Sequence, residues 1–382
     1  MKRKLKKPSG LLMLPLLIAV VAFLVMPQQS IAQDFDIRGR LMMDAFWGID
    51  DTDDFSNGFN NRRARMGVNG RLTDKWDGRI EVDFADGGLS PNDFRLRRSF
   101  SHGGRLWLGQ YKVPQGLNEL TSSNSITFIE RATNSNMIAD ARRMGIAYSY
   151  YGSQGGFKTM MFGRALGQRG AIEGDMPLGF ALRGIYAPTI GDGRLHLAGS
   201  IVYEDKKENR SIGFSDRPEA RDSKGGRALL SLSINDPGLS STFKTGFELA
   251  YINGPFSVEA EYLQVSVDID PGDSPTFGGW HVQSTYVFGG QRSYSPDGFG
   301  GVRPDGDTGA LEIAARFSHM DLNDSGYIGG KQSNFTLGLN RYVTANLRFM
   351  MNVIFADISE TAEGGASDRN PVIGVMRAHY YF

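Results

Sequence analysis

The sequence predicts an all-β protein, a transmembrane antiparallel β-barrel of about sixteen strands. Apolar and polar residues alternate in one segment after another, and the connections between these segments alternate between short and long. Beyond residue 32, no apolar run approaches the ~18 residues of a membrane-spanning helix. A closed barrel pairs every backbone group without leaving an edge, which is how strands can cross lipid.

The composition excludes several other classes. The chain has 382 residues, 49 of them glycine, with 40% hydrophobic residues and no cysteine. Glycine shows no G-X-Y period, so a collagen is excluded. The lack of cysteine excludes disulfide scaffolds, cysteine-ligated metals and thiol nucleophiles. Equal numbers of basic and acidic residues, 42 each, give no indication of a nucleic-acid partner.

Residues 1–32 read as a secretory signal peptide, which leaves 33–382 as the barrel domain. Five basic residues precede an apolar run over 11–26, and Ser30-Ile31-Ala32 provides small residues for cleavage near Ala32. The alternative, a membrane anchor, requires about 20 apolar residues, and this run is shorter and contains Pro15. Residues 1–32 hold five of the 42 basic groups and no acid, so 37 basic and 42 acidic groups remain, a net charge of −5.

The strands are predicted from a period of two residues. In 36–47, alternate positions hold Ile37, Leu41 and Trp47, whereas the positions between them include Asp36 and Arg38. A strand places two such sets on opposite faces, but a helix mixes them. The same period predicts sixteen strands, at 36–47, 61–72, 76–86, 92–102, 104–113, 143–150, 156–164, 178–187, 193–205, 242–252, 255–267, 279–288, 310–321, 334–342, 346–358 and 371–382.

The lengths of the connections indicate an outer-membrane barrel. Short links such as 73–75 and 253–254 alternate with long polar ones such as 49–60, 114–140 and 206–241. Tight turns at one end and long loops at the other are typical of these barrels. The link 289–308 departs from the pattern, because it is long where a short turn is expected, and the sequence offers no reason for it.

The two faces of the strands differ in kind. One face is apolar, as at Phe243 and Phe247, and the other carries full charges, as at Glu259 and Arg316. A soluble β-sandwich is the alternative. The signal peptide, the alternating loop lengths and the chain end argue against it. Phe382, Tyr380 and Met376 share one face of the last strand and resemble the terminal signal that the barrel-assembly machinery recognises.

The inward face predicts a basic lumen. Basic residues outnumber acidic ones there, although the mature chain is acidic. Arginine and lysine in a narrow channel favour anions, and a guanidinium matches phosphate oxygens in pairs. The alternative is a general pore in which the arginines pair with acids across strands. The inward basic positions are Arg38, Arg40, Arg63, Arg65, Arg71, Arg95, Arg97, Arg143, Arg183, Lys244, Arg316, Arg348 and Arg377.

The third long connection, 114–140, is expected to fold into the lumen. Connections of this length are usually functional. Ile126, Phe128 and Ile129 would be costly to leave in water, so we expect them to pack on the inner wall, with 125–132 as a helical plug. Glu119 and Glu130 are expected to anchor the loop on wall arginines. An external loop at a trimer contact is the alternative.

An enzyme of the outer membrane is a further alternative. The five histidines are far apart in the sequence and show no paired metal-ligand spacing. Neither a G-x-S-x-G elbow nor a P-loop occurs. Asp50-Asp51-Thr52-Asp53-Asp54 lacks the pattern of a dedicated calcium loop. We therefore predict no catalytic residue, no metal and no cofactor.

Several motifs resemble the phosphate-selective porins of the O and P type. They are FNNRRARMGV at 59–68, KWD at 75–77, GQYKVP at 109–114, NELTSS at 118–123, ITFIER at 126–131 and RRMG at 142–145. The similarity continues through 214–221, 246–262 and the last strand. It implies a sixteen-stranded homotrimer whose third loop narrows the lumen and whose basic residues conduct phosphate or other oxyanions.

The resemblance also assigns residues. It places the anion pathway at Arg62, Arg63, Arg65, Lys112, Arg217 and Arg221, to which the inward pattern adds Arg38, Arg40, Arg95 and Arg97. The constriction loop would present Glu119, Thr121, Ser122, Asn124, Glu130 and Arg131. Family members commonly place a basic residue where this chain has Asn124-Ser125, which favours general anions or larger solutes over phosphate alone.

Together these patterns predict a passive diffusion channel in the outer membrane of a Gram-negative cell. Small inorganic anions would be the cargo, with a weakly selective general porin as the alternative. The expected partners are outer-membrane lipids and lipopolysaccharide, the barrel-assembly machinery and two further copies of the chain.

Overall fold

The computed structural model describes residues 34–52, 55, 57–85, 87–166, 178–207, 210–221, 229–361 and 368–382. The predicted signal peptide, 1–32, and its cleavage site lie outside the described residues, as do Asp53 and Asp54 of the acidic run. No helix in the described part of the chain combines the length and the apolar character that a membrane span requires.

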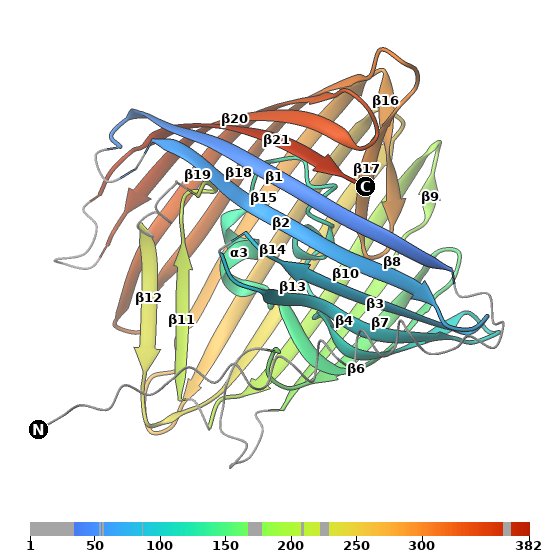
Figure 1. Cartoon of the computed structure of the whole chain (residues 1–382). Helices are drawn as coiled ribbons and strands as arrows, with labels where there is room; N and C mark the ends of the chain where they lie inside the picture. Colours follow the sequence, from blue (N-terminus) through green and yellow to red (C-terminus); the bar gives the residue numbers. More distant parts are fainter. Residues whose placement is uncertain are drawn as a thin grey trace, which may run out of the picture.

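Sixteen antiparallel strands close into a barrel (Figure 1), as the alternation predicts. Each strand pairs with the next one along the wall, and β1 pairs with β21 to close the ring. The two-residue β9 (Thr189–Ile190) continues β8 along β10. The wall strands are β1 (Phe35–Asp50), β2 (Gly58–Arg71), β3 (Trp76–Asp83), β4 (Ser90–Ser99), β5 (Gly104–Lys112), β6 (Arg142–Tyr151), β7 (Gly155–Phe162), β8 (Gly179–Tyr186), β10 (Gly193–Asp205), β13 (Leu239–Asn253), β14 (Phe256–Ile269), β15 (Thr276–Phe288), β18 (Ala310–Asp324), β19 (Tyr327–Tyr342), β20 (Leu347–Ser359) and β21 (Val372–Tyr381).

The wall has an apolar outside and a charged inside. On β13, Phe247 is 64% exposed, whereas its neighbour Glu248 is only 3% exposed. On β18, Phe317 faces outward and Arg316 is buried in the lumen. A soluble protein buries its apolar face, so this inverted pattern suits a barrel surrounded by lipid.

The chain end completes the seam between β1 and β21. Phe382 exchanges two backbone hydrogen bonds with Gly39, with N–O distances of 2.9 and 3.1 Å. Its ring covers Gly39, where a Cβ would lie 2.5 Å from the ring. Met376, Tyr380 and Phe382, the predicted assembly signal, are about half exposed on the outer surface.

Three connections carry further structure. The link between β5 and β6, the third loop, contains helices α2 (Leu117–Leu120) and α3 (Thr133–Ile138). The fifth loop forms a hairpin, β11 (Ser211–Asp216) and β12 (Leu230–Asn235). The long link at the short-turn end forms another hairpin, β16 (Gly290–Ser295) and β17 (Gly298–Pro304). In Figure 1, β11–β12 lies toward the left and β16–β17 toward the right of the barrel.

An apolar cluster fills part of the barrel interior. Phe214 and Leu230 of the fifth loop pack with Ile138 of the third loop and with inward wall residues, among them Leu263 and Met320. These side chains are at most 3% exposed. The cluster fastens two loops to the β14–β18 wall and leaves the opposite side of the lumen open.

Candidate permeation pathway

The third loop is fastened to the wall through its backbone carbonyls. Four carbonyls between 126 and 130 accept hydrogen bonds from inward side chains of β18 to β21. The pairs are Arg348 with Ile126, Asn340 with Thr127, Arg377 with Ile129 and Arg316 with Glu130, at 2.6–3.1 Å. Side-chain donors therefore take the place of helical N–H groups. The prediction of a helix at 125–132 is wrong, and the longer helix of the loop begins at Thr133.

Glu130 secures the same segment with its side chain. Its carboxylate accepts two hydrogen bonds from Arg62, at 2.6 and 2.9 Å, and one from Arg377, at 3.1 Å. Burial alone would raise the pKa of Glu130. The charges of Arg62, Arg63 and Arg377 outweigh it, so this pKa lies well below its usual range.

Glu119 has a similar role at the start of the loop. Its carboxylate lies 2.9 Å from Nε of Arg131 and 3.3 Å from Nζ of Lys112. The Lys112 ammonium also donates to the carbonyls of Glu119, Leu120 and Thr121. The predicted pathway lysine thus has most of its donors engaged in holding the loop.

Acidic groups of β14 hold α2 and α3, the two helices of the third loop. The Glu261 carboxylate accepts from Ser135 Oγ at 2.5 Å and from the backbone N–H of Asn118 at 3.3 Å. Glu259 accepts from the Asn118 side chain at 2.9 Å and lies 3.1 Å from His281. The contacts of these two buried carboxylates are therefore with groups of the protein.

The fifth loop brings one carboxylate deep into the barrel. Glu219 is 1% exposed and accepts hydrogen bonds from Arg316, from Ser318 at 2.6 Å and from Thr336 at 3.1 Å. It also accepts from the backbone N–H of Thr133 at 3.2 Å. Sequence reasoning missed Glu219, because a loop residue has no strand period that shows its direction.

The β16–β17 hairpin meets the third loop from the other end of the barrel. Arg292 forms two hydrogen bonds of 2.8 Å with Glu312 of the wall and donates to the carbonyl of Ser125 at 2.6 Å. The N–H of Phe299 donates to Thr121 Oγ1 at 3.2 Å. The long link 289–308 thus joins the two loops in filling one side of the lumen.

The open space lies along the other side, against β1 to β7. It is a cavity of about 490 Å³ between the wall and the third loop. Of the residues that the structure describes, twelve basic and four acidic ones line it. The basic ones are Arg38, Arg40, Arg62, Arg63, Arg65, Arg79, Arg95, Lys112, Arg131, Arg142, Lys158 and Arg221, and the acidic ones are Asp93, Glu119, Glu130 and Asp297.

Carboxylates beside the cavity hold several of these cations. Glu81 lies 3.1 Å from Arg40 and 3.5 Å from both Arg38 and Arg65. Asp83 accepts from Arg65 at 2.6 Å. These contacts fix the guanidinium groups on the wall, and donors of the same side chains can also reach the third loop. Arg40, for example, also donates to Ser123 Oγ of the loop at 2.6 Å.

Arg63 differs from its neighbours. It is 5% exposed, and its Nε has no hydrogen-bond partner in the described part of the chain. One of its terminal nitrogens lies 3.6 Å from the sulfur of Met42. A buried guanidinium with an unsatisfied donor is costly unless a ligand or water completes it.

Nearer the short-turn end, Trp107 supports three cations. The guanidinium carbons of Arg95 and Arg97 lie 4.9 and 5.1 Å from its ring centroid, and Nζ of Lys158 lies at 4.4 Å. The indole N–H donates to Ser149 at 2.9 Å, which fixes the ring. Cation–π contacts of this kind hold the cations in place without consuming their hydrogen-bond donors.

Most of the predicted residues meet at this cavity. It is lined by Arg38, Arg40, Arg62, Arg63, Arg65, Arg95, Lys112, Arg221, Glu119, Ser122, Glu130 and Arg131. Arg97, Arg217, Thr121 and Asn124 lie outside the lining, and Asn124 contacts His379 at 3.3 Å. Sequence reasoning missed Arg79, Arg142 and Lys158. Arg79 alternates in phase with Glu81, so its inward direction was available from the period of its strand.

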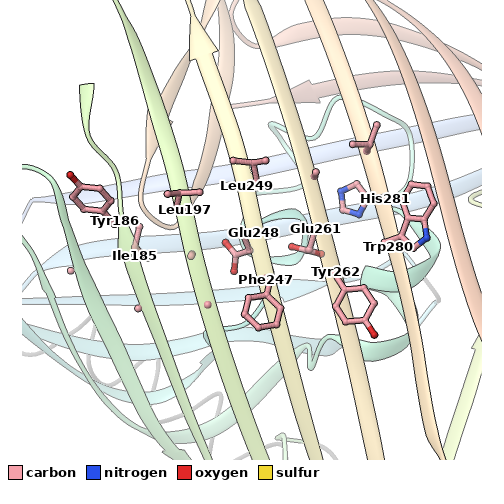
Figure 2. A pocket seen from close by; sticks show the side chains of 16 residues that line it. Ile185, Tyr186, Leu197, Phe247, Glu248, Leu249, Glu261, Tyr262, Trp280 and His281 are labelled. Atoms are coloured by element: carbon pink, nitrogen blue, oxygen red, sulfur yellow. The ribbon is translucent and has the colours of Figure 1, made fainter. Parts of the chain in front are cut away.

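A larger hollow, about 900 Å³, is not part of the pathway. It lies on the outer surface, where Phe247, Tyr262 and Trp280 come from three neighbouring strands (Figure 2). Beside them, Gly184 and Gly199 are paired across β8 and β10 and leave open space where side chains would lie. This groove faces the lipid side of the wall.

A closed barrel with an apolar outer band and a charged cavity between wall and loops is a channel-forming protein of the outer-membrane type. The family model described as "Phosphate-selective porin O and P" matches residues 35–382, and the chain belongs to this family. The resemblance seen in the sequence motifs is thereby confirmed, and the protein is an outer-membrane channel.

Among the relatives, Porin O of Pseudomonas aeruginosa is 24% identical over 359 residues, which cover 84% of this chain and 81% of that protein. An uncharacterized protein of Caulobacter vibrioides is 28% identical over 339 residues, 83% of this chain and 66%, just under two thirds, of its own length.

Solved structures share the fold. An anion-selective porin from Comamonas acidovorans superposes with a TM-score of 0.58 at 13% identity, covering 92% of this chain and all of that one. OmpT of Vibrio cholerae in its trimer form gives a TM-score of 0.60 at 13% identity, with the same coverage.

Proposed function

We propose that this channel conducts small anions, phosphate and other oxyanions among them, passively down their gradients along the β1–β7 side of the lumen. The observation that carries the proposal is the charge of the cavity, where twelve basic residues stand against four acidic ones in the described part of the chain. A basic constriction replaces part of the hydration shell of an anion and repels cations. The porin from Comamonas acidovorans that shares this fold is described as anion-selective, which is consistent with this cargo.

The donors along the path support oxyanions as a class. Arg63 and Ser122 line the same cavity, one with a guanidinium and the other with a hydroxyl. Guanidinium and hydroxyl donors match the several acceptor oxygens of phosphate, sulfate or a carboxylate. Position 124 adds no cation to the path, because asparagine is uncharged and Asn124 lies outside the lining. The set of donors therefore favours oxyanions in general over phosphate alone.

The first prediction tests this charge. Arg63→Ala with Arg65→Ala removes two cations from one strand, and we expect the anion-to-cation permeability ratio to fall about threefold, equivalent to ~0.7 kcal/mol of lost attraction. Reversal potentials across planar bilayers in a chloride gradient, with and without added phosphate, measure it. Arg71→Ala is the matched control, because Arg71 is on the same strand, 65% exposed, and outside the cavity.

The results of this experiment distinguish anion conduction from a general porin. Cation preference in the unmodified protein, without block by phosphate, would contradict anion conduction and favour a general porin. Anion preference that the double variant leaves unchanged would place the selective path elsewhere in the lumen.

We also propose that the protein is a homotrimer. We propose further that the signal peptide is removed near Ala32 and that the assembly machinery recognises the chain through its last strand. The trimer form of OmpT supports the oligomer, and the outward Met376, Tyr380 and Phe382 support the recognition. Outer-membrane lipids and lipopolysaccharide would surround the apolar band. Light scattering of the detergent-purified protein measures the oligomer, and a monomeric mass would contradict it.

A further inference from the structure

One acidic residue of the pathway comes from the hairpin of the short-turn end. Asp297 lies at the hairpin tip, between β16 and β17, and reaches across to β6 and β8. Its carboxylate accepts from the Tyr151 hydroxyl at 2.7 Å and lies 3.9 Å from Arg183. The same arginine donates to the carbonyl of Pro296 at 2.8 Å. The tip is therefore held firmly, and the position of the carboxylate is set by the wall.

This carboxylate faces the cavity. The side chain of Asp297 is 36% exposed, whereas that of Arg183 is fully buried, so water in the path reaches the acid and not its partner. Lys158 lines the same cavity, and no described carboxylate lies within 4 Å of its ammonium. Burial alone would raise the pKa of Asp297, but Lys158 and Arg183 outweigh it and hold this pKa below its ordinary value. Asp297 is thus charged at neutral pH.

We propose that Asp297 is a specificity-determining counter-charge, whose carboxylate competes with the transported anion for Lys158 and speeds its release at the short-turn end. The inference rests on the proposed anion conduction. A channel must bind its ion strongly enough to admit it and weakly enough to let it leave. The part of the path farther from the short turns has many cations. Near the short-turn end, the fixed negative charge of Asp297 beside Lys158 shortens the time for which the transported anion stays bound there.

The test is Asp297→Asn. The amide oxygen still accepts from Tyr151, so the tip keeps its hydrogen bond and loses only the charge. We expect the anion-to-cation permeability ratio to rise and phosphate to stay bound about threefold to tenfold longer, read as longer blocking events in single-channel chloride currents. Asp297→Glu should behave like the unmodified protein.

Asp305→Asn is the matched control. Asp305 follows the same hairpin, is exposed and does not line the cavity, so its loss changes the net charge equally and should leave selectivity unchanged. Liposome swelling with a small neutral sugar reports whether the hairpin stays in place, because a displaced hairpin would speed sugar entry. Equal swelling by Asp297→Asn and the unmodified protein is expected.

The outcomes separate the two proposals. If the unmodified channel prefers anions and Asp297→Asn leaves both the reversal potential and the blocking times unchanged, the counter-charge is wrong and anion conduction stands. If the unmodified channel prefers cations, anion conduction itself is wrong. Faster sugar entry with altered selectivity would show that Asp297 serves to hold the hairpin, which also overturns the inference.

Discussion

Arginine has two separate roles inside this barrel. Arg348 and Arg377, both buried, donate to backbone carbonyls of the third loop. Arg63 on β2 and Arg95 on β4 line the open cavity. The same residue type thus anchors the third loop and also lines the open cavity, because a guanidinium can donate five hydrogen bonds and keeps its charge when buried.

The charge state of Asp216 responds to pH near neutrality. Its Oδ2 atom is buried and has no hydrogen-bond partner among the described residues, and Glu219 lies nearby. Burial and the charge of Glu219 raise the pKa of Asp216 to about 8, against 3.8 in the unfolded chain. The folded hairpin therefore binds this proton more tightly, and the stability of its docking falls as the pH rises from about 4 to about 8.

We predict that the fifth loop becomes more accessible to protease between pH 6 and 9. The measurement is the rate of trypsin cleavage within 206–238, divided at each pH by the rate for Asp216→Asn. The variant lacks the titrating group and has the same cleavage sites, so the pH profile of trypsin itself cancels. A ratio that is constant with pH would show that Asp216 does not control the docking of the loop.

At the scale of elements, the third loop depends on donors that belong to other elements. Arg348→Met removes the donor to the carbonyl of Ile126 without leaving a carboxylate unpaired. An unsatisfied buried carbonyl costs about 1–3 kcal/mol, so we expect the segment to leave the wall part of the time. Single-channel recordings should show greater open-channel noise.

Arg341→Met is the control for this experiment. Arg341 donates to the carbonyl of Thr308 at the exposed end of β19, away from the third loop. Equal noise in the two variants would mean that the anchor at Ile126 does not hold the loop.

Some of these elements could be predicted from the sequence, and others could not. The sixteen strands followed from the two-residue period, because a wall between lipid and water imposes that period on every strand. The helix expected at 125–132 was wrong, since its carbonyls are paired with residues more than 180 positions later. For the same reason the purpose of 289–308 could not be predicted: its contacts with Glu312 and Thr121 exist only in the closed barrel.

On the scale of the whole molecule, three insertions fill one side of the lumen and leave the basic side open. We predict that replacing 291–303 by Asn-Gly increases single-channel conductance about twofold or more, since the hairpin forms part of the constriction. The variant should carry Glu312→Gln, because Glu312 loses its partner Arg292. Conductance equal to that of Glu312→Gln alone would contradict this role of the hairpin.

The contacts of Arg377 link the constriction to the completion of the wall. This residue of the last strand forms two hydrogen bonds with Asp44 of the first strand, at 2.6 and 2.7 Å, and holds Ile129 and Glu130 of the loop. Arg377 therefore contacts both Asp44 and the third loop only once β1 and β21, the two ends of the sheet, have paired. During biogenesis, a barrel whose seam is still open lacks the Asp44 carboxylate that orients Arg377 toward the loop, so closure of the wall completes this anchor of the third loop.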